Sequence, residues 1–377
     1  MIKIFETGDL HFGRKYDRYP EAKNKLTESR FQCLERMVRV AEREGCGIFA
    51  VTGDTFDNVT NIKVGDVKRV VEILAKFSGS VIVLPGNHDF YTDETKLWRD
   101  FRKAMASVDH NITIADSFAP IEMEVGDETV VIYPACCHEK HSMRNNLDWI
   151  RNSSIDADKY SVGLAHGAIA GITPDQNGEY FRMTEVELSA IPVDVWLIGH
   201  THIPYPIREP ADAVSGYRIL NAGTPEQLDL GNHTVGLGYV VMLEKKNGKT
   251  GVTVKAIQTG AVNYIDESVK LEPGGNALEE QLISIAERCD GGTIVRLTLS
   301  GVLQAEEYKN RKRLYDNYLS GLLAYEVVDE ELSVRMTEEE IRAEFPEFGF
   351  AAQVLRQLLD DPVESRMAYG LLKECRE

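Results

Sequence analysis

Six short apolar runs, rich in β-branched residues, recur through residues 1–260 of the 377-residue chain. Each is short enough to be a strand buried on both faces, and helical patterns separate the first three. Strands that alternate with helices predict an α/β fold in which helices flank a sheet. The runs are Ile2–Thr7, Gly47–Thr52, Val81–Pro85, Thr129–Tyr133, Ser161–Ala165 and Val195–Ile198.

Two amphipathic helices are expected between the first three runs. The first begins at Thr27, which can cap it, and ends near Gly45, whereas Gly79 stops the second. Apolar residues recur in both at the spacing of one buried helix face. These residues are Phe31, Leu34, Val38 and Ala41 in the first helix and Val67, Val70, Val71, Leu74 and Phe77 in the second. Later runs on either side of Asn247-Gly248 predict an antiparallel hairpin.

A domain boundary is predicted between residues 262 and 276, where Asp266-Glu267-Ser268 and Pro273-Gly274-Gly275 have the composition of turns. The expected domains are residues 1–262, a small α/β domain at 277–336 and a group of helices at 337–377. In the small domain we expect helices at Ala277–Cys289 and Glu306–Ser320 and strands at Thr293–Leu299 and Ala324–Met336. Thr337 and Glu340 form a plausible capping box for the first terminal helix.

The overall charge argues against one class of function. The chain has 42 Lys and Arg against 60 Asp and Glu, a formal net charge of −18, whereas nucleic-acid binding depends largely on basic residues. With 43% hydrophobic residues, global disorder is excluded. No apolar run approaches the roughly 18 residues of a membrane-spanning helix, and no export signal is visible. The six cysteines are therefore expected to be reduced thiols in the cytoplasm.

Five short motifs place potential metal ligands directly after predicted strands. Such strand ends converge on one crevice in an α/β sheet. In two of the motifs the ligands are spaced i, i+2, which puts both on one side of an extended segment. A glycine before four of the sites lets the backbone turn sharply. The motifs are Gly8-Asp9-Leu10-His11, Gly53-Asp54-Thr55-Phe56-Asp57, Gly86-Asn87-His88-Asp89, Ala165-His166-Gly167 and Gly199-His200-Thr201-His202.

The donor types in these motifs favour a particular kind of metal. Carboxylates, imidazoles and one amide carbonyl, without a thiolate, suit divalent ions such as manganese, iron or zinc. Taken singly, each histidine could equally be an ordinary core or surface residue. Five of the nine histidines, however, fall in these strand-end motifs, which favours a metal site.

The five motifs together resemble the calcineurin-like metallophosphoesterase superfamily, whose pattern is D-x-H, GD-x-x-D, GNH-D/E, H and GH-x-H. All five blocks occur in this order over residues 9–202. The resemblance implies a four-layer α/β/β/α sandwich for residues 1–262, with a smaller C-terminal α/β cap and terminal helices. It also implies two divalent metal ions, with manganese favoured and iron, zinc or magnesium as alternatives.

Carried over motif by motif, the resemblance implies a role for each site residue. Asp9, His11 and His202 would hold one ion, and Asn87, His166 and His200 would hold the other. Asp54 would bridge the two ions. His88 would lie beside the site, where it stabilises the transition state or protonates the leaving oxygen while the paired metals activate a water. Asp57 and Asp89 would either orient imidazoles from the second shell or simply cap turns.

The opening Asp9-Leu10-His11-Phe12-Gly13-Arg14 resembles the start of SbcD-type DNA repair nucleases, with Phe12 in place of the more usual Leu. Thr224–Gln227, after an expected strand at 217–220, resembles the Asn-Ala-Gly-Thr/Ser turn of those nucleases. Protein phosphatases of the superfamily typically have Arg-Gly after the second block and Arg before the third. Here these positions hold Asn58-Val59 and Pro85, which disfavours that branch.

The C-terminal part agrees with SbcD-type nucleases in architecture and order only. The resemblance implies a DNA-binding cap, terminal helices that dock on an SbcC-type ABC ATPase, and a homodimer. An apolar stripe could bind such a partner, or it could be ordinary core. The stripe consists of Phe350, Val354, Leu358 and Leu359.

Candidate DNA contacts lie in two basic clusters. Residues 12–43 hold nine bases against five acids, with Phe12, Tyr16 and Tyr19 interleaved as possible stacking platforms. The alternative in both clusters is a solvated helix face. The candidate contacts are Arg14, Lys15 and Arg18 in the first cluster and Arg311, Lys312 and Arg313, next to Lys309, in the second.

Cys136-Cys137-His138, with His141 nearby, could suggest zinc, but vicinal cysteines lack the usual spacing, and buried free thiols are the alternative.

The sequence as a whole predicts a manganese-dependent nuclease that hydrolyses phosphodiester bonds of DNA, as an exonuclease or endonuclease in DNA repair. A small-molecule or cyclic-nucleotide phosphodiesterase is the alternative within the same superfamily, and a non-catalytic metal-stabilised scaffold is a third possibility. Because the chain is acidic, we expect weak, salt-sensitive DNA binding that depends on a partner.

Overall fold

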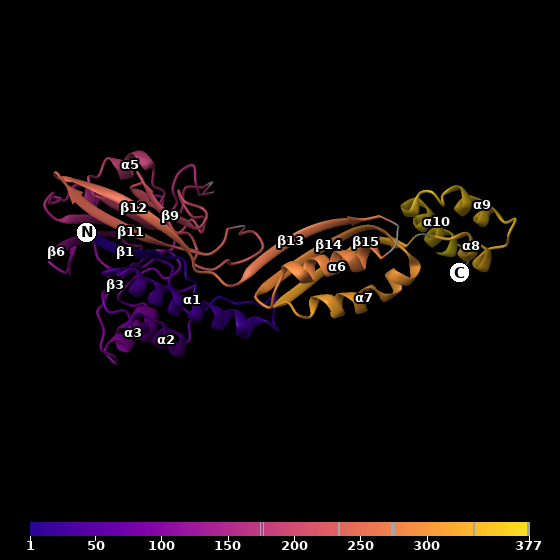
Figure 1. Ribbon diagram of the computed structural model, residues 1–377, viewed down its shortest axis with the longest axis horizontal. Helices are drawn as coiled ribbons and strands as arrows, with labels where there is room; N and C mark the ends of the chain where they lie inside the picture. The colour runs from indigo at the N-terminus through magenta and orange to yellow at the C-terminus, as the bar shows by residue number, and fades with distance from the viewer. Residues whose placement is uncertain (174, 176, 233, 273–275, 335, 375–377) are drawn as a thin grey trace. The chain divides into compact units, whose positions relative to one another are not determined.

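The computed structural model describes residues 1–173, 175, 177–232, 234–272, 276–334 and 336–374 (Figure 1). The chain divides into two compact units, Met1–Val262 and Asn263–Glu377. The turn expected at Pro273–Gly275 lies outside the described residues. None of the helices in the described ranges is long and apolar enough to cross a membrane.

Two β-sheets form the middle of the first unit. The strands of the larger sheet are β1 (Ile2–Thr7), β2 (Ile48–Val51), β3 (Ser80–Val83), β4 (Ile112–Ile114), β9 (Ala211–Ser215), β11 (Leu237–Lys246) and β12 (Lys249–Gln258). Those of the smaller sheet are β5 (Ile121–Val125), β6 (Glu128–Ala135), β7 (Tyr160–His166), β8 (Val195–Gly199) and β10 (Ile219–Leu220). The strand orders are β4-β3-β2-β1-β11-β12-β9 and β10-β8-β7-β6-β5. All six predicted strands are present, with bounds that differ by at most two residues.

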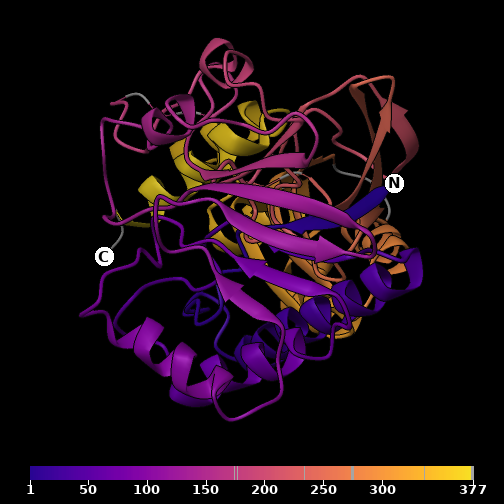
Figure 2. The same ribbon diagram turned by 90° about the vertical axis from the view of Figure 1, so that its left-hand side faces the viewer.

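Helices cover the outer faces of both sheets. The larger sheet packs against α1 (Lys23–Glu44), α2 (Val64–Leu74) and α3 (Lys96–Met105), which lie on one side of the strands in Figures 1 and 2. The short helices α4 (Asp148–Arg151) and α5 (Glu185–Ser189) cover the smaller sheet. Alternation along β1 explains the layering, since Phe5 packs toward the helices while Ile2 and Ile4 pack between the sheets. The predicted four-layer α/β/β/α sandwich is thereby confirmed.

The direction of the strands sets where functional residues can gather. β1 to β4 run parallel to one another in the larger sheet, and β6 to β8 run parallel in the smaller one. Parallel strands end at the same edge of their sheet, so the segments that follow β1, β2 and β3 lie together, as do those that follow β7 and β8. The candidate ligands of four motifs lie in such segments, and His166 is the last residue of β7 itself.

Helix α1 differs from the prediction at its start. It begins at Lys23, after Ala22, so Thr27 lies within the first turns and the expected cap is wrong. Lys23 and Lys25 are good helix formers, and tertiary packing of Leu26 extends the helix without a side-chain cap. The predicted end is confirmed, because Gly45 adopts a left-handed φ of 69° and its N–H bonds back to Glu42.

The hairpin predicted around Asn247-Gly248 is also confirmed. β11 and β12 pair in antiparallel register from Leu237 opposite Gln258 to Lys246 opposite Lys249. Asn247 and Gly248 have φ values of 52° and 73°, as a two-residue hairpin turn requires.

In its described residues, the second unit contains a parallel three-stranded sheet, two long helices and three terminal helices. The elements are β13 (Asn263–Leu271), α6 (Ala277–Arg288), β14 (Thr293–Leu303), α7 (Ala305–Leu319), β15 (Ala324–Val334), α8 (Glu338–Glu344), α9 (Phe350–Gln357) and α10 (Pro362–Glu374), with strand order β13-β14-β15. The capping box at Thr337 and Glu340 is confirmed.

One prediction in this unit is wrong. Asp266-Glu267-Ser268 was expected to be a turn but lies inside the edge strand β13. Ile265, Val269 and Leu271 of this strand pack into the core of the unit. Glu267 lies at an inward position between them and pairs with Arg288. The alternation of apolar residues that would predict a strand is therefore broken at these three polar residues.

Candidate metal centre

The site is built from loops that the backbone holds side by side. The loop after β1 pairs with the loop after β2, because the amides of Asp9 and His11 donate to the carbonyls of Gly53 and Asp54, each at 3.0 Å. Asp54, Asn87 and His200 lie in the loops after β2, β3 and β8, whereas His166 is the last residue of β7. The structure therefore brings residues of both sheets to one edge, and Asp9, Asp54, Asn87 and His166 are fully buried there.

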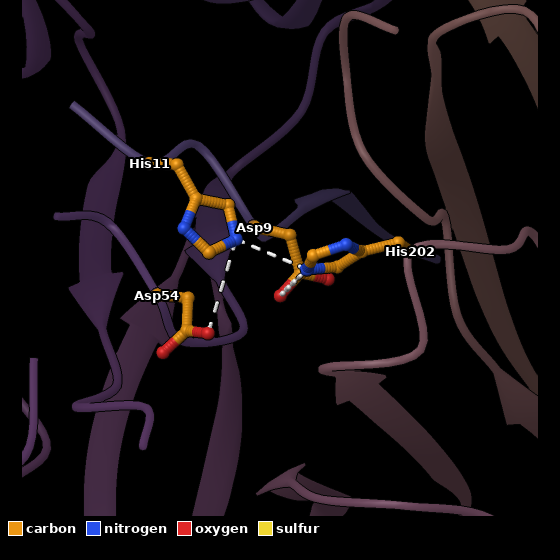
Figure 3. Close-up of side chains that lie close together, drawn as sticks. All are labelled: Asp9, His11, Asp54 and His202. Atoms are coloured by element: carbon orange, nitrogen blue, oxygen red, sulfur yellow. Dashed lines mark hydrogen bonds and ion pairs between the residues drawn. The ribbon is translucent and has the colours of Figure 1, made fainter. Parts of the chain in front are cut away.

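Asp9, His11, Asp54 and His202 form the first group of potential ligands (Figure 3). The Nε2 atoms of His11 and His202 lie 3.0 Å apart. His202 Nε2 is 3.8 Å from Asp9 Oδ1, and His11 Nε2 is 3.9 Å from Asp54 Oδ2. Ligand atoms at roughly 2.0–2.2 Å from one ion lie roughly 3.0–3.5 Å from each other, so a modest contraction would place all four around a single ion.

Asp54, His166 and His200 form the second group, and Asn87 lies at its centre. Asn87 Oδ1 is 3.0 Å from both His166 Nε2 and His200 Nδ1. His166 Nε2 is also 3.3 Å from Asp54 Oδ2. Because Asp54 belongs to both groups, its carboxylate lies where a ligand that bridges two ions would lie.

The hydrogen-bond partners of His166 indicate that a cation belongs in the second group. His166 Nδ1 lies 2.8 Å from the carbonyl of Thr52 and must donate, because a carbonyl oxygen can only accept. In the neutral ring the Nε2 lone pair then faces two oxygens, Asn87 Oδ1 and Asp54 Oδ2. Asp54 Oδ2 has no hydrogen-bond partner although it is buried. Either a proton or a metal ion must separate these lone pairs, and the residues present fit a metal ion.

The pKa values of His166, Asp9 and His200 are shifted by burial and by the charges of neighbouring site residues. Burial disfavours a charged His166, yet the Asp54 carboxylate raises the pKa of this imidazole to about 9. Burial together with the nearby Asp54 raises the pKa of Asp9 to about 8. Burial and the neighbouring His166 lower the pKa of His200 to about 3. These opposed shifts are those of a cluster of ligands that divalent cations would neutralise.

Backbone strain is concentrated at the same residues. Seven residues other than glycine have positive φ in the described chain, and five of them are candidate ligands. Such conformations cost of order 1–3 kcal/mol each and persist where the surroundings impose them, often at functional sites. The five are Asp9, His11, Asp54, His200 and His202, with φ values of 52°, 48°, 49°, 96° and 55°.

The glycines of the motifs are required mainly by close contact between loops. A Cβ on Gly86 would lie 2.3 Å from both the amide nitrogen and the Oδ1 of Asp54. Gly53 combines a φ of 104° with a Cβ position 2.2 Å from His166 Nδ1. A sharp turn was expected at each motif glycine, and Gly53 has the positive φ of such a turn. At Gly86 the lack of a side chain matters instead because two loops meet there.

His88 lies beside the two groups and is only partly buried. Its amide donates to Asp54 Oδ1 at 2.8 Å, and its Nδ1 donates to the carbonyl of Asp57 at 2.9 Å. The Nε2 atom is then the nitrogen left to meet a substrate. The ring packs edge-on against His11, with centroids 5.1 Å apart.

The two other carboxylates of the motifs have different contacts. Asp57 Oδ1 lies 3.3 Å from His11 Nδ1, where it can fix the orientation of that imidazole. Asp89 accepts hydrogen bonds from the amides of Phe56 and Gly86 at 3.0 and 2.7 Å, and so ties the loops after β2 and β3 together. Whether either carboxylate influences metal binding stays a prediction.

Sequence reasoning missed several contacts of the ligands. Buried Asn221 donates to Thr201 Oγ1 at 2.6 Å and supports the loop that carries His200 and His202. The ring of Tyr180 packs against that of His200, with centroids 5.1 Å apart. Asn221 directly precedes the Ala-Gly-Thr of the turn and could have been noticed, whereas no local pattern indicates Tyr180.

The predicted DNA contacts have mixed environments. Arg14 pairs with Asp229 at 3.2 Å, and Lys15 and Arg18 are exposed. Arg311 pairs with Asp329 at 2.8 Å, whereas Lys312 and Arg313 of the same helix are exposed.

The prediction that Phe12, Tyr16 and Tyr19 could offer rings for stacking is wrong for two of the three residues. Phe12 and Tyr16 are buried, because Phe12 packs in the core beneath the helices and Tyr16 holds Arg30. Only Tyr19 keeps a partly exposed ring.

The vicinal cysteines do not form a metal site with their neighbouring histidines. Cys136 and Cys137 are buried, and burial raises the pKa of the Cys136 thiol to about 12. Cys136 Sγ lies 3.3 Å from His138 Nε2, whereas His141 packs against Tyr180 instead. Within the described residues, the groups able to hold an ion contain no cysteine.

The profile of the calcineurin-like phosphoesterase family matches residues 2–204, and the chain belongs to this family. Similar solved structures include a dimetal phosphatase from Danio rerio, with 14% identity over 67% of this chain and 98% of that chain and a TM-score of 0.37. Another is the calcineurin-like phosphoesterase YfkN from Bacillus subtilis, with 12% identity over 68% of this chain and 90% of that chain and a TM-score of 0.40. No curated protein matches the chain significantly.

Family and site together define the class of enzyme. The family match spans every candidate ligand. Two of the three groups of potential ligands share Asp54, and the third consists of His11, Asp57 and His88. The protein is a metal-dependent phosphoester hydrolase with the residues of a dinuclear centre.

Proposed function

We propose that the protein is a manganese-dependent nuclease of the SbcD type, which hydrolyses phosphodiester bonds at DNA ends. The observation that carries this proposal is a cationic cavity beside the metal centre. The cavity has a volume of about 460 Å³ and is lined by Arg14, Lys15, Asp57, Asn58, Thr60 and Asn61. Asp57 belongs to both places, because its carboxylate contacts His11 of the centre.

This cavity suits a phosphate chain better than a small neutral substrate. Lys15 is exposed, and Arg14 has five N–H donors, of which its pair with Asp229 uses only part. Asn58 and Thr60 add polar groups without negative charge. A phosphate next to the reacting one could therefore bind here, which favours a polymeric diester as substrate.

The chemistry follows from the positions of the protein groups. When bound, two divalent ions supply an activated water and neutralise charge on the reacting phosphate. Asp54 and Asn87 hold their oxygens between the imidazoles, while the carbonyl of Thr52 fixes the ring of His166. The buried ligands are therefore preorganised on rigid strand ends before the substrate arrives.

His88 is the proposed acid of the reaction. With Nδ1 committed to the carbonyl of Asp57, Nε2 is the nitrogen of this partly buried ring that is left for a substrate. A proton at Nε2 can hydrogen-bond a phosphate oxygen or pass to the leaving 3′ or 5′ oxygen of the sugar. The ring lies against His11 without lying inside either group that contains Asp54.

The proposal includes an SbcC-type ATPase partner that docks on the terminal helices, and a homodimer. Of the predicted stripe, Leu359 packs into the core of these helices, but Phe350 is 78% exposed. Phe348, Met367 and Leu371 are also exposed on this segment. Such a group of exposed apolar side chains is typical of an interaction surface. The five cysteines of the described residues are free, in keeping with a cytoplasmic enzyme.

Nuclease assays with two substrate classes test the proposal. Purified protein with Mn²⁺ should degrade linear DNA and leave cyclic nucleotides nearly untouched. Lys15→Ala should raise the KM for DNA several-fold, whereas Lys246→Ala, an exposed lysine at the hairpin end of β11, should not. If cyclic nucleotides were the better substrates, the nuclease function would be wrong and the small-molecule phosphodiesterase would replace it.

A further inference from the structure

Aromatic side chains from four separate segments gather at the surface of the first unit. Phe118 stacks on His138 with ring centroids 4.9 Å apart and planes 25° apart, and on Trp149 at 6.5 Å and 29°. The ring of Tyr91 is tilted by 51° against that of His138, with centroids 6.2 Å apart. Phe118, His138, Trp149 and Tyr91 are called the aromatic platform below.

Two rings of the aromatic platform are also held by hydrogen bonds to backbone carbonyls. His138 Nε2 donates to the carbonyl of Asp116 at 2.9 Å, and Trp149 Nε1 donates to the carbonyl of Pro134 at 2.9 Å. Phe118 is nevertheless 43% exposed, and His138 is exposed as well. The stack is therefore rigid and keeps ring surface open to solvent, which is the arrangement that a planar ligand needs.

The aromatic platform lies close to the metal centre. Tyr91 is three residues from His88, and three residues of chain span at most roughly 11 Å. The amide of Tyr91 donates to the carbonyl of Cys137 at 2.9 Å, and the amide of Cys137 donates to the carbonyl of Pro85 at 3.1 Å. The segment that follows β6 and carries His138 is thus hydrogen-bonded to the loop that carries His88.

A cation completes the surroundings of the platform. The guanidinium of Arg102 lies over the ring of Tyr91, 5.7 Å from its centroid, and pairs with Asp116. Single exposed aromatic residues are common and need no function. Here, however, near-parallel rings and a guanidinium stand together next to a phosphoesterase centre.

We propose that the aromatic platform binds an unpaired nucleobase of the strand whose phosphodiester lies at the metal centre. The inference rests on the proposed function and adds to it a subsite for the base. A nucleobase offers a flat π-face that stacks on Phe118 and His138 whatever its identity. The platform thereby favours single-stranded or frayed ends and shows little preference for sequence.

A double-mutant cycle between protein and substrate tests the subsite. Single-stranded oligonucleotides are prepared with one abasic nucleotide moved stepwise from the cleaved bond, and the KM and kcat of cleavage are measured with Mn²⁺. Phe118→Ala should raise the KM for the intact oligonucleotide roughly 5- to 150-fold, with kcat little changed. One abasic position should cause the same loss in the wild-type protein and no additional loss in Phe118→Ala.

Two further variants serve as controls. Phe118→Tyr keeps a ring for stacking and should restore the wild-type KM. Tyr217→Ala removes a ring of matched exposure, 42% against 43% for Phe118, outside the platform and should change nothing. Manganese content and melting temperature, measured on each variant, check that the centre and the fold are intact.

The outcomes separate this inference from the proposed function. If the wild-type protein cleaves oligonucleotides and Phe118→Ala does so with unchanged KM, or if no abasic position mimics the variant, the platform is not a base subsite, while the nuclease function stands. If the wild-type protein cleaves no oligonucleotide, the nuclease function fails and the subsite fails with it.

Discussion

At the scale of the residue, the role of each histidine in the centre depends on what its second ring nitrogen contacts. The Nδ1 of His166 donates a hydrogen bond to the carbonyl of Thr52, and Asp57 contacts Nδ1 of His11. Both rings therefore direct Nε2 toward the carboxylate of Asp54. Metal-binding histidines commonly have such a partner on the distant nitrogen. His88 has the same kind of partner, but its free nitrogen lies outside the two groups that share Asp54. This difference is the basis for proposing His88 as a proton donor and the other residues as ligands.

Replacement of His88 tests that separation. We expect His88→Ala to lower kcat by roughly 10²- to 10⁴-fold, the usual effect of losing a positioned acid. Both metal ions should still bind, because the two groups that share Asp54 do not include His88, which lies in a third group with His11 and Asp57. Steady-state kinetics and metal analysis of the same preparation check this. Loss of an ion from the variant would mean that His88 is a ligand.

At the scale of the element, the centre depends on how closely the loops that follow β2 and β3 approach each other. Gly86 lies against the backbone of Asp54, and Asp89 accepts amide hydrogen bonds from both loops. Neither loop can shift without moving the carboxylate of Asp54. The glycine therefore has a role in packing that its φ does not reveal.

Alanine substitutions at two glycines distinguish a steric clash between the loops from the general effect of adding a Cβ methyl group. Gly86→Ala would place Cβ 2.3 Å from the amide nitrogen of Asp54 and should lower the free energy of unfolding by about 1–3 kcal/mol, together with metal affinity. Gly65→Ala in α2 meets no atom within 4 Å and should stabilise the protein by up to about 1 kcal/mol. Urea unfolding of both variants provides the measurement. Equal stability of the two would show that the loops are not tightly packed.

At the scale of the whole molecule, an acidic chain must bind an acidic polymer if the proposed function is right. The net charge is −18, but exposed bases occur locally, as at Lys15 beside the centre and at Lys312 and Arg313 on α7. Local bases can contact phosphates while the remaining charge repels the polymer. The expected result is weak binding with a strong dependence on salt.

The salt dependence of DNA binding tests the contribution of α7. Replacing both Lys312 and Arg313 by alanine should reduce the slope of log K against log salt by about 1.8, or roughly 0.9 for each lost phosphate contact on duplex DNA. Fluorescence anisotropy over a salt series measures the slope. An unchanged slope would exclude this face of α7 from the DNA interface.

The sequence predicted which side chains gather at one edge of the sheets, but it did not predict every element around them. Asp9, Asp54 and His166 could be named because each lies at the end of an apolar run, where the fold itself brings side chains together. Strand β13 was missed because Glu267 faces inward and is neutralised by Arg288, a contact between distant residues. Tyr180 and the stack on Phe118 were missed for the same reason, since only the folded chain brings their partners to them.

We propose that seven residues hold two metal ions around Asp54. Crystals grown with Mn²⁺ and measured at a wavelength sensitive to manganese would test it most directly. We predict two anomalous peaks roughly 3.5–4 Å apart, one bound by Asp9, His11 and His202 and the other by Asn87, His166 and His200, with the Asp54 carboxylate bound to both. A single peak, or two peaks of which only one contacts Asp54, would contradict the account.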